Sequence, residues 1–286
     1  MKIVDMRLRP PLKSWVKQLQ FTRGDDYFTK LGYARPLSTK TQKLADLLAE
    51  MDRADVQWGV IMGRQSEAPL GVIPNDEIAD CINQHPGRFV GWVGLDLAQP
   101  IDWCLQEIDR CLKMPGFKGV SIEPPISKNT TLSSSDDARL DPIYEECVKR
   151  NVPINITLSA QLQARLGRPY ENSSPLQLYN VGRRFPKLVI HVAHAAWPYV
   201  MDMIGVAFVC PNIWISPDQY MVKRLPGAEE YAKAINNYFH DRACFGTAYP
   251  SRPHDQLIRE YGELGFSAEV YPKVMGLNAL RLMKMD

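Results

Sequence analysis

The chain has 286 residues, of which 45% are hydrophobic and 23% charged, and its formal net charge is +2. This length suits two average domains or one α/β barrel, and the near-neutral charge argues against nucleic acid or an anionic membrane as the main partner. No apolar run reaches the roughly 18 residues of a membrane-spanning helix, no signal-peptide pattern opens the chain, and the six cysteines are scattered, which is typical of a cytoplasmic protein with reduced thiols.

Short apolar runs alternate along the chain with segments whose apolar residues recur at helical spacing. The runs predict strands at residues 2–10, 56–62, 89–95, 118–123, 152–158, 188–193, 212–216 and 243–247. The helical spacing predicts helices near residues 41–51, 75–84, 101–111, 138–150, 176–183, 228–239, 255–264 and 268–284, with a further helix after Trp197-Pro198. Residues 11–39 have weak periodicity and are expected to form a lid inserted after the first strand.

Eight strands that alternate with helices favour an α/β fold, namely a (β/α)8 barrel of the TIM type that spans residues 1–286 as a single domain. A doubly wound parallel sheet would also alternate. However, the glycine-rich phosphate loop of a dinucleotide-binding sheet is missing after the first strand. Chemistry in a barrel takes place at the C-terminal ends of its strands, so the site is expected there.

The first predicted strand carries Asp5, Arg7 and Arg9 at alternate positions, with Met6 and Leu8 between them. Alternate residues of a strand share one face, so a carboxylate and two guanidiniums should stand in line. Buried charges need partners, and the row therefore predicts either the lining of a functional pocket or a structural salt bridge. Asp5 is expected to orient Arg7 from deeper in the barrel.

Polar residues also mark the ends of the other predicted strands. In chain order they are Arg64, Glu123, Thr157, His194, Asp218 and Tyr249. His194 is a candidate general base or acid, because histidine titrates near neutrality. Asp218 is expected to orient His194 or to act as an acid itself. Arg64, Thr157 and Tyr249 are candidate substrate contacts.

Two residues have weaker or competing interpretations. Glu123 is expected either to pair with Arg7 or Arg9, or to transfer protons. His191 lies three residues before His194, on the opposite face of the predicted strand, so it is expected to pack against helices.

Several segments resemble the amidohydrolase superfamily, in its decarboxylase and lactonase branch. The matching segments are DMRLRP (5–10) with the D-x-H-x-H opening, GFKGVSIEPP (116–125), VPINITLS (152–159) and KLVIHVAHAAWP (187–198) with the fourth to sixth strands, CFGTAYP (244–250) with the eighth strand, and VMGLNALRLM (274–283) with the C-terminal helix. The resemblance covers nearly the whole chain. It implies a TIM-like barrel with a metal site. It also implies the chemistry of a hydrolase or of a lyase, such as a decarboxylase.

Most of the metal-binding positions of that family are replaced in this chain. Arg7 and Arg9 stand where the resemblance places two histidines, Thr157 replaces the histidine of the fifth strand, and Ala248 replaces the aspartate of the eighth. Only His194 is kept, so the usual metal site cannot be carried over.

Guanidinium groups at these positions favour an anion over a cation. Guanidinium has no lone pair to donate, and a dication about 4 Å away is opposed by roughly 8 kcal/mol at an effective dielectric constant of about 20. The same groups bind a carboxylate bidentately, so Arg7 and Arg9 are predicted to clamp a substrate anion. The alternative is an internal network in which Glu123 and Asp218 satisfy both arginines.

The sequence therefore predicts an enzyme that acts on a small carboxylated substrate, by hydrolysis of a lactone- or ester-like bond or by decarboxylation, with no cofactor expected. One alternative keeps zinc or manganese on rebuilt ligands, namely Glu123, His194 and Asp218. Another is a non-catalytic, small-molecule-binding pseudoenzyme, which the number of lost ligands favours. The sequence does not determine the oligomeric state, and a homo-oligomer is compatible with it.

Overall fold

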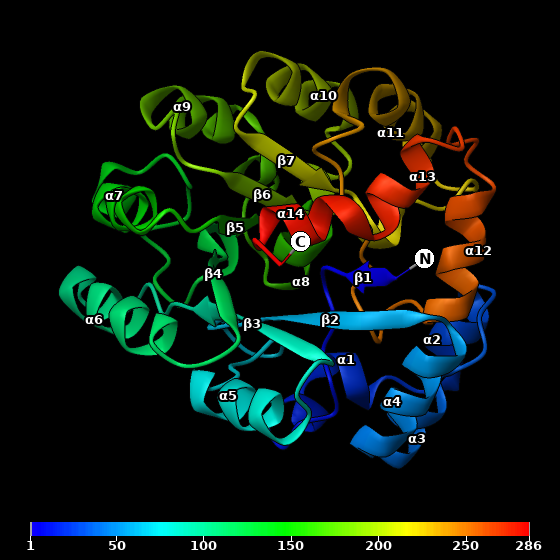
Figure 1. Ribbon diagram of the computed structural model, residues 1–286. Coiled ribbons are helices and arrows are strands. Elements are labelled where there is room, and N and C mark those ends of the chain that lie inside the picture. The colour runs from blue at the N-terminus through cyan, green and yellow to red at the C-terminus, as the bar shows by residue number, and fades with distance from the viewer. Residues whose placement is uncertain (1, 286) are drawn as a thin grey trace.

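Seven parallel strands in sequential order form the sheet of this protein in a computed structural model that describes residues 2–285. The strands are β1 (Ile3–Asp5), β2 (Val56–Met62), β3 (Phe89–Gly94), β4 (Phe117–Ile122), β5 (Ile154–Thr157), β6 (Ile190–Ala193) and β7 (Ile213–Ser216). Each strand pairs with the next, and the sheet curls inside a ring of helices (Figure 1). The predicted barrel of the TIM type is confirmed, with a difference at the eighth strand.

The predicted eighth strand, residues 243–247, closes the barrel as an extended segment instead of a regular strand. The amide of Cys244 donates to a backbone carbonyl of β7 at 3.0 Å, and the amide of Met6 donates to the carbonyl oxygen of Phe245 at 3.0 Å. The amide of Thr247 then donates to the carboxylate of Asp5 at 2.9 Å. A side chain therefore replaces the next rung of the backbone ladder, and the regular strand pattern ends.

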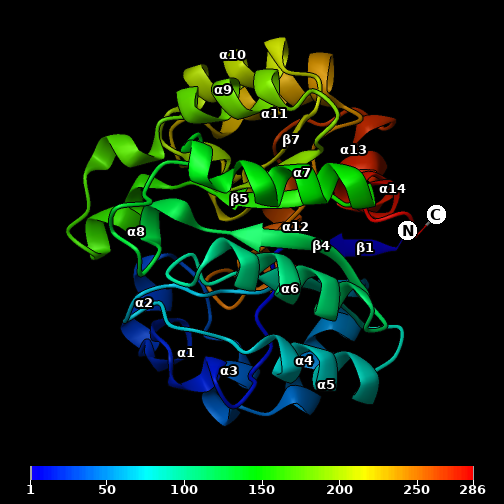
Figure 2. The same ribbon diagram turned by 90° about the vertical axis from the view of Figure 1, so that its left-hand side faces the viewer.

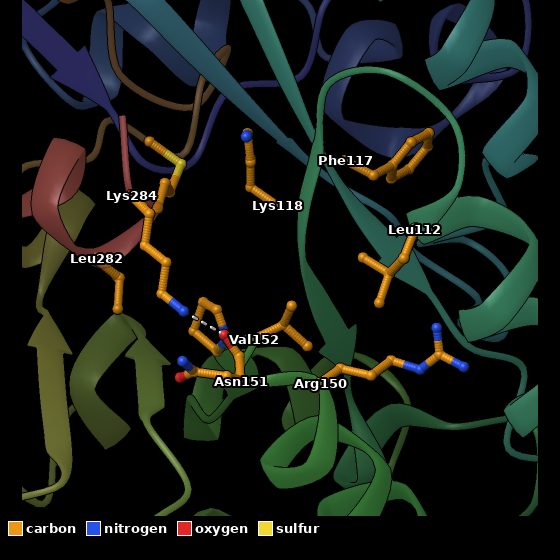
Figure 3. A pocket seen from close by; sticks show the side chains of 10 residues that line it. Leu112, Phe117, Lys118, Arg150, Asn151, Val152, Leu282 and Lys284 are labelled. Carbon is orange, nitrogen blue, oxygen red and sulfur yellow. Dashed lines mark hydrogen bonds between the residues drawn. The ribbon is translucent and has the colours of Figure 1, made fainter. Parts of the chain in front are cut away.

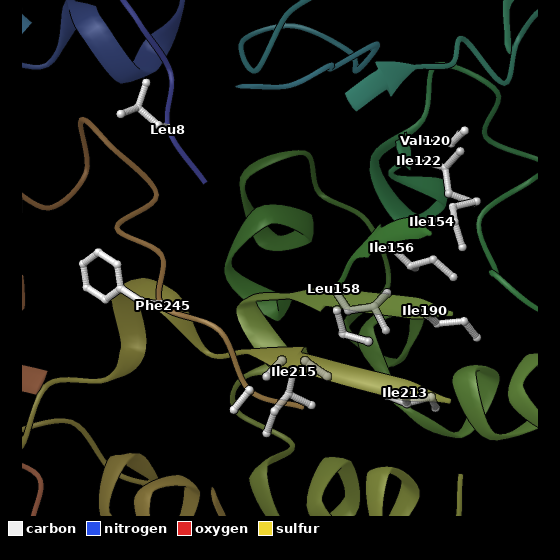
Figure 4. Packing of buried hydrophobic residues seen from close by; sticks show 14 of the residues in the cluster. Leu8, Val120, Ile122, Ile154, Ile156, Leu158, Ile190, Ile213, Ile215 and Phe245 are labelled. Carbon is white, nitrogen blue, oxygen red and sulfur yellow. The ribbon is translucent and has the colours of Figure 1, made fainter. Parts of the chain in front are cut away.

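In β4 to β6, apolar residues that face the outer helices alternate with polar residues that face the barrel axis. In β5, Ile154 and Ile156 join the large apolar cluster between strands and helices. Asn155 and Thr157 of the same strand hydrogen-bond to each other at 3.1 Å. Figure 4 shows the outward aliphatic side chains of β4 to β7 packed together. This two-residue period directs the polar residues of several strands into one interior.

One end of the barrel is closed by apolar packing. Val4, Met62 and Trp92 form a second buried cluster with Ala279 and Leu282 of α14 (Asn278–Leu282). Figure 1 shows α14 across the middle of the ring of strands, and Figure 2 shows both chain ends beside it. The polar strand ends lie at the opposite end, which we call the mouth.

The outer helices follow the predicted segments closely. They are α4 (Leu44–Arg53), α5 (Asn75–Gln84), α6 (Ile101–Leu112), α7 (Asp141–Arg150), α9 (Leu176–Arg184), α10 (Val200–Val209), α11 (Ala228–Ala234), α12 (His254–Gly262) and α13 (Val270–Pro272). A further short helix, α8 (Ala160–Arg165), forms in a segment for which no helix is predicted. The segment expected to be a lid contains η1 (Trp15–Lys17), α1 (Leu19–Thr22) and α2 (Asp25–Lys30), and α3 (Leu37–Thr41) begins within it. Figure 2 places α1, α2 and α8 at the end away from α14. Within residues 2–285, no helix combines the length and the hydropathy needed to span a membrane.

Candidate active site

Glu123, directly after β4, is the centre of a buried ion-pair network. Arg64 donates to both carboxylate oxygens, from Nε to Oε2 at 2.9 Å and from Nη2 to Oε1 at 2.9 Å. Arg7 donates from Nη2 to Oε1 at 3.0 Å, and the hydroxyl of Ser66 donates to Oε2 at 2.5 Å. None of the four residues is more than 7% exposed, so the network is shielded from water.

The surroundings of Glu123 favour its role as an arginine partner over proton transfer. Burial raises the pKa of its carboxyl group, but Arg64 and Arg7 together outweigh burial and hold that pKa well below its usual value. The group is therefore ionised at neutral pH and already accepts four hydrogen bonds. For Arg7 and Arg64, this geometry favours the internal network over a substrate clamp, although Nε of Arg7 and Nη1 of Arg64 have no hydrogen-bond partner within residues 2–285.

Arg7 also connects the network to polar residues inside the barrel. Its Nη1 donates to Oγ1 of Thr157 at 3.0 Å, and the side-chain oxygen of Asn155 lies 3.0 Å from Nδ1 of His191. Burial and the nearby Arg7 lower the pKa of His191 to about 3, so its ring is neutral. The expectation that His191 packs against helices is wrong, because β6 turns its side chain into the barrel. There its ring meets Trp92 edge to face, with 5.7 Å between the ring centres.

Asp5 does not orient the guanidinium of Arg7 as predicted. β1 ends at Asp5 and the chain bends at the next two residues, so strand alternation does not extend to Arg7. The carboxylate accepts from the hydroxyl of Thr247 at 2.5 Å and lies 3.1 Å from Nε2 of His254. Arg7 contacts it only through its backbone amide, at 3.0 Å. Sequence reasoning missed the buried His254, because a position at a helix start gives no sign of such a partner.

Arg9 differs from the other two arginines, because no carboxylate within residues 2–285 forms an ion pair with it. Its Nη1 donates to the carbonyl oxygens of Ala248 at 2.8 Å and Tyr249 at 3.1 Å. The residue is 5% exposed. Burial and the like charges of Arg64 and Arg7 lower the pKa of Arg9 well below its usual value. Arg9 is thus a buried cation with no ion-pair partner among the described residues, and the charges of Glu123 and Asp218 only partly oppose the lowering of its pKa.

His194 and Asp218 form a second buried pair, at the ends of β6 and β7. Nδ1 of His194 donates to Oδ1 of Asp218 at 2.7 Å, and the backbone amide of His194 donates to Oδ2 at 3.1 Å. Both residues have positive φ angles, 67° and 41°, so neither follows the alternation of its strand. Burial lowers the pKa of His194 against the opposing charge of Asp218. The ring is therefore neutral at pH 7, with a lone pair on Nε2.

Arg9 and His194 line the same cleft at the mouth of the barrel. Gln20 and Arg23 of the expected lid segment, together with Tyr27 of α2, line it as well. The cleft encloses about 30 Å³, which is room for one or two water molecules. The mouth is therefore closed over Arg9 and His194 in this state.

Tyr249 lies beside the cleft but directs its hydroxyl group elsewhere. The hydroxyl donates to Glu50 at 2.6 Å and contacts the hydroxyl of Ser38. The ring of Tyr249 stacks on that of His254, with 4.8 Å between the ring centres. The structure therefore does not support the predicted contact between this hydroxyl and a substrate. The backbone carbonyl of Tyr249 faces the site instead, through its bond to Arg9.

A larger cavity lies at the opposite end of the barrel. It measures about 430 Å³ and is lined by residues around the starts of β4 and β5 and the end of the chain, including Phe117, Lys118, Val152 and Leu282 (Figure 3). None of its lining residues is a predicted site residue. Convergent charges and a histidine, and not size, identify the candidate site in this barrel.

The donor groups at the mouth do not fit a divalent metal ion. Glu123 is engaged by two guanidiniums and Asp218 by His194. In the part of the chain that the structure describes, no group of three His, Cys, Asp or Glu side chains is placed to hold a metal. Arg7 stands where the resemblance places a ligand, and its charge repels a cation. This donor chemistry disfavours the alternative of rebuilt ligands.

Comparisons with known proteins agree with the fold. A family model described as amidohydrolase matches residues 4–284. A 2-amino-3-carboxymuconate-6-semialdehyde decarboxylase from Dictyostelium discoideum is 27% identical over 261 residues, which are 81% of this chain and 71% of that protein. An uncharacterized TIM-barrel protein from Bordetella bronchiseptica superposes with a TM-score of 0.90 at 28% identity, over 100% of this chain and 99% of its own. A dihydroxybenzoic acid decarboxylase from Polaromonas, solved with bound manganese and an inhibitor, shares the fold with a TM-score of 0.66 at 16% identity, over 92% of this chain and 94% of its own.

The family match extends over nearly every described residue, so it includes the strand ends at which Arg7, Arg9, Thr157 and Ala248 replace the expected ligands. It confirms the resemblance and supports an enzyme of the hydrolase or carboxy-lyase type. By its sequence and its barrel, this chain belongs to the amidohydrolase family.

Proposed function

We propose that this protein is an amidohydrolase-fold enzyme that acts on a small carboxylated substrate without a resident metal ion. Arg9 binds the substrate carboxylate, and His194 transfers the proton. The observation that carries the proposal is their shared cleft, where a buried cation without a carboxylate partner lies beside a neutral imidazole. The name of the Dictyostelium relative, a decarboxylase of a carboxymuconate semialdehyde, adds support for a carboxylated substrate.

Arg9 has the donors that such a substrate needs. The carbonyl oxygens of Ala248 and Tyr249 hold Nη1 and so fix the guanidinium plane. Nε and Nη2 form the remaining fork, which matches the two oxygens of a carboxylate. A carboxylate bound there also neutralises a charge that is buried at a cost, and this favours binding.

Hydrolysis uses His194 in its resting, neutral form. Nε2 accepts a proton from a water molecule while the water oxygen bonds to the carbonyl carbon of a lactone or ester. Asp218, bonded to Nδ1–H, stabilises the imidazolium that forms. The carbon–oxygen bond to the leaving group then breaks, and the imidazolium returns the proton to the leaving oxygen. His194 is neutral again at the end of the cycle.

Decarboxylation is the second candidate, and the Dictyostelium relative favours it. In that reaction the bond to the carboxylate carbon breaks, carbon dioxide leaves, and the remaining carbon takes a proton. A protonated His194 supplies that proton. Burial lowers the pKa of His194, and this direction favours hydrolysis, which needs the neutral ring.

Residues 11–39 act as a lid in this proposal, within a barrel that forms a single domain. Gln20, Arg23 and Tyr27, on or beside the short helices α1 and α2, close the cleft and leave about 30 Å³. A ring-sized substrate needs several times that volume, so this segment has to move to admit it.

The proposal is tested with a panel of carboxylated lactones and aromatic carboxylic acids, with release of acid and of carbon dioxide measured separately. In Arg9→Ala we expect KM to rise at least about tenfold, because a charge-assisted bidentate pair is lost. In His194→Gln we expect kcat to fall about 10²- to 10⁴-fold with little change in KM. Arg184→Ala and His240→Gln, at surface positions outside the cleft, are matched controls and should keep wild-type kinetics.

The two outcomes that contradict the proposal are distinct. Turnover that is unchanged in both Arg9→Ala and His194→Gln places the chemistry elsewhere. Binding of the acids through Arg9, with no turnover of any compound by the wild type, identifies a non-catalytic binder.

A further inference from the structure

The cleft is lined by three arginines that have no acidic partner. They are Arg9, Arg23 and Arg165, and none forms an ion pair with a carboxylate among the described residues. Arg9 lies just beyond the end of β1, Arg23 lies in the expected lid segment, and Arg165 is the last residue of α8. The positive charge of the cleft therefore comes from three separate parts of the fold.

The contacts of Arg23 show a cation held without an anion. Its guanidinium carbon lies 4.1 Å from the ring centre of Tyr27, and its Nη1 donates to the hydroxyl of Ser251 at 3.4 Å. Arg165 and Arg252 are near enough to contribute to the lowered pKa of Arg23, after burial and against the raising effect of Tyr27. Nη1 of Arg252 is itself buried without a hydrogen-bond partner within residues 2–285.

The remaining polar lining of the cleft is neutral. Gln20, Gln161, Gln219 and Ser251 contribute amide and hydroxyl groups, and no aspartate or glutamate within residues 2–285 lines the cleft. Elsewhere on this protein the exposed arginines are mixed. Arg183 and Arg259 form no ion pair among the described residues, whereas others find acidic partners. Arg110 pairs with Asp76 and Glu107, for example, and Arg139 with Asp137. Glu123 and Asp218 lie nearby at the mouth, but neither lines this cleft.

We propose that the cleft binds a ligand with two anionic groups, an inner carboxylate on Arg9 and an outer carboxylate between Arg23 and Arg165. This inference rests on the proposed function and specifies its substrate class as dicarboxylates. The inner group lies beside His194. The outer group draws Arg23 toward Arg165, so a dianion holds the expected lid segment against α8. A monoanion lacks the outer group and leaves this contact unmade.

The test compares matched acids that differ by one carboxylate, namely isophthalate with benzoate and muconate with sorbate. Binding is measured by isothermal titration calorimetry on the full chain, so the readout does not depend on turnover. In the wild type we expect at least one dicarboxylate to bind about tenfold or more tightly than its monocarboxylate partner. The preference should shrink as the salt concentration rises.

The variant Arg23→Ala/Arg165→Ala carries the decisive comparison, because both residues lie at the rim and their loss leaves the core intact. It should reduce dicarboxylate affinity to the level of the monocarboxylate and leave monocarboxylate affinity unchanged. Arg184→Ala is the matched control and should keep the preference. Circular dichroism confirms that each variant is folded.

Each contrary result is informative. A wild type that binds both members of each pair equally, or a double variant that keeps the preference, overturns the second subsite. Monocarboxylate binding that is lost in Arg9→Ala would still uphold the proposed function in that case. Absence of any carboxylate binding that depends on Arg9 overturns both proposals.

Discussion

Replacing Glu123 with glutamine tests the network that organises the mouth. The change removes the carboxylate that pairs with Arg7 at 3.0 Å and with Arg64 at 2.9 Å, and it places an amide NH2 against their N–H donors. Breaking a buried ion pair by removing one partner costs roughly 3–5 kcal/mol. We expect a loss of about 4 kcal/mol in the free energy of unfolding. For a chain of 286 residues, this corresponds to a fall in Tm of about 7 °C.

The assay is urea and thermal unfolding of the wild type, Glu123→Gln and the control Glu269→Gln, whose carboxylate is exposed and pairs only with Lys273. The control should unfold like the wild type. The pKa of Glu123 is lowered on folding, so its stabilisation is present above the unfolded pKa of about 4.3 and is lost as pH falls toward the folded value. The difference between variant and wild type should therefore narrow below about pH 4. A variant within about 0.5 kcal/mol of the wild type at pH 7 refutes the reasoning.

Two further predictions concern residues beside the cleft. Asp218→Asn should lower kcat and shift the acid limb of the rate–pH profile to lower pH. The reason is that the charge of Asp218 raises the pKa of His194 against the lowering effect of burial. An acid limb that stays at the same pH contradicts the pairing of the two residues. Tyr249→Phe should leave kcat and KM unchanged, because the hydroxyl faces Glu50, and should reduce the free energy of unfolding by about 1–3 kcal/mol. A fall in kcat with unchanged stability would instead indicate a substrate contact.

The barrel could be predicted from two periodicities in the sequence. The two-residue period of segments such as INIT in β5 and the helical spacing of the segments between strands give the alternation that fixes the fold. The rule that the site of a barrel lies at its strand ends predicts that four residues share one mouth, and the structure places them there. They are Arg64, Glu123, His194 and Asp218. These residues lie near ends of regular strands, so their position in the sequence predicts their position in space.

The errors arise where the backbone leaves that regular pattern. β1 ends at Asp5 and bends, so Asp5 and Arg7 do not share the environment that strand alternation predicts. His194 has a positive φ and lies outside the strand alternation, so its orientation does not imply that His191 faces the helices, and His191 faces the barrel interior instead. The expected eighth strand loses its ladder because the carboxylate of Asp5 accepts the amide of Thr247. Such local side-chain contacts join residues far apart in the chain and leave no periodic signal.

Arg7 and Arg9 look equivalent in the sequence, yet the structure separates them. Glu123 follows β4 at a position from which it reaches Arg7, and the two share a salt bridge at 3.0 Å. Arg9 lies beyond the end of β1, where its neighbour is Ala248, at the position that carries an aspartate in the family pattern. The loss of that carboxylate leaves Arg9 without an anion. From the sequence, Arg23 is more simply a surface charge than a pocket residue, and Arg165 gives no signal, because both lie in segments with little periodicity.

The central claim is that the mouth of this barrel is built for an anion in place of a metal ion. Elemental analysis of active protein, purified without any chelator, tests it most directly. We expect zinc and manganese well below one ion per chain, with turnover unaffected by dialysis against EDTA. One tightly held ion per chain, whose removal abolishes turnover, would contradict it.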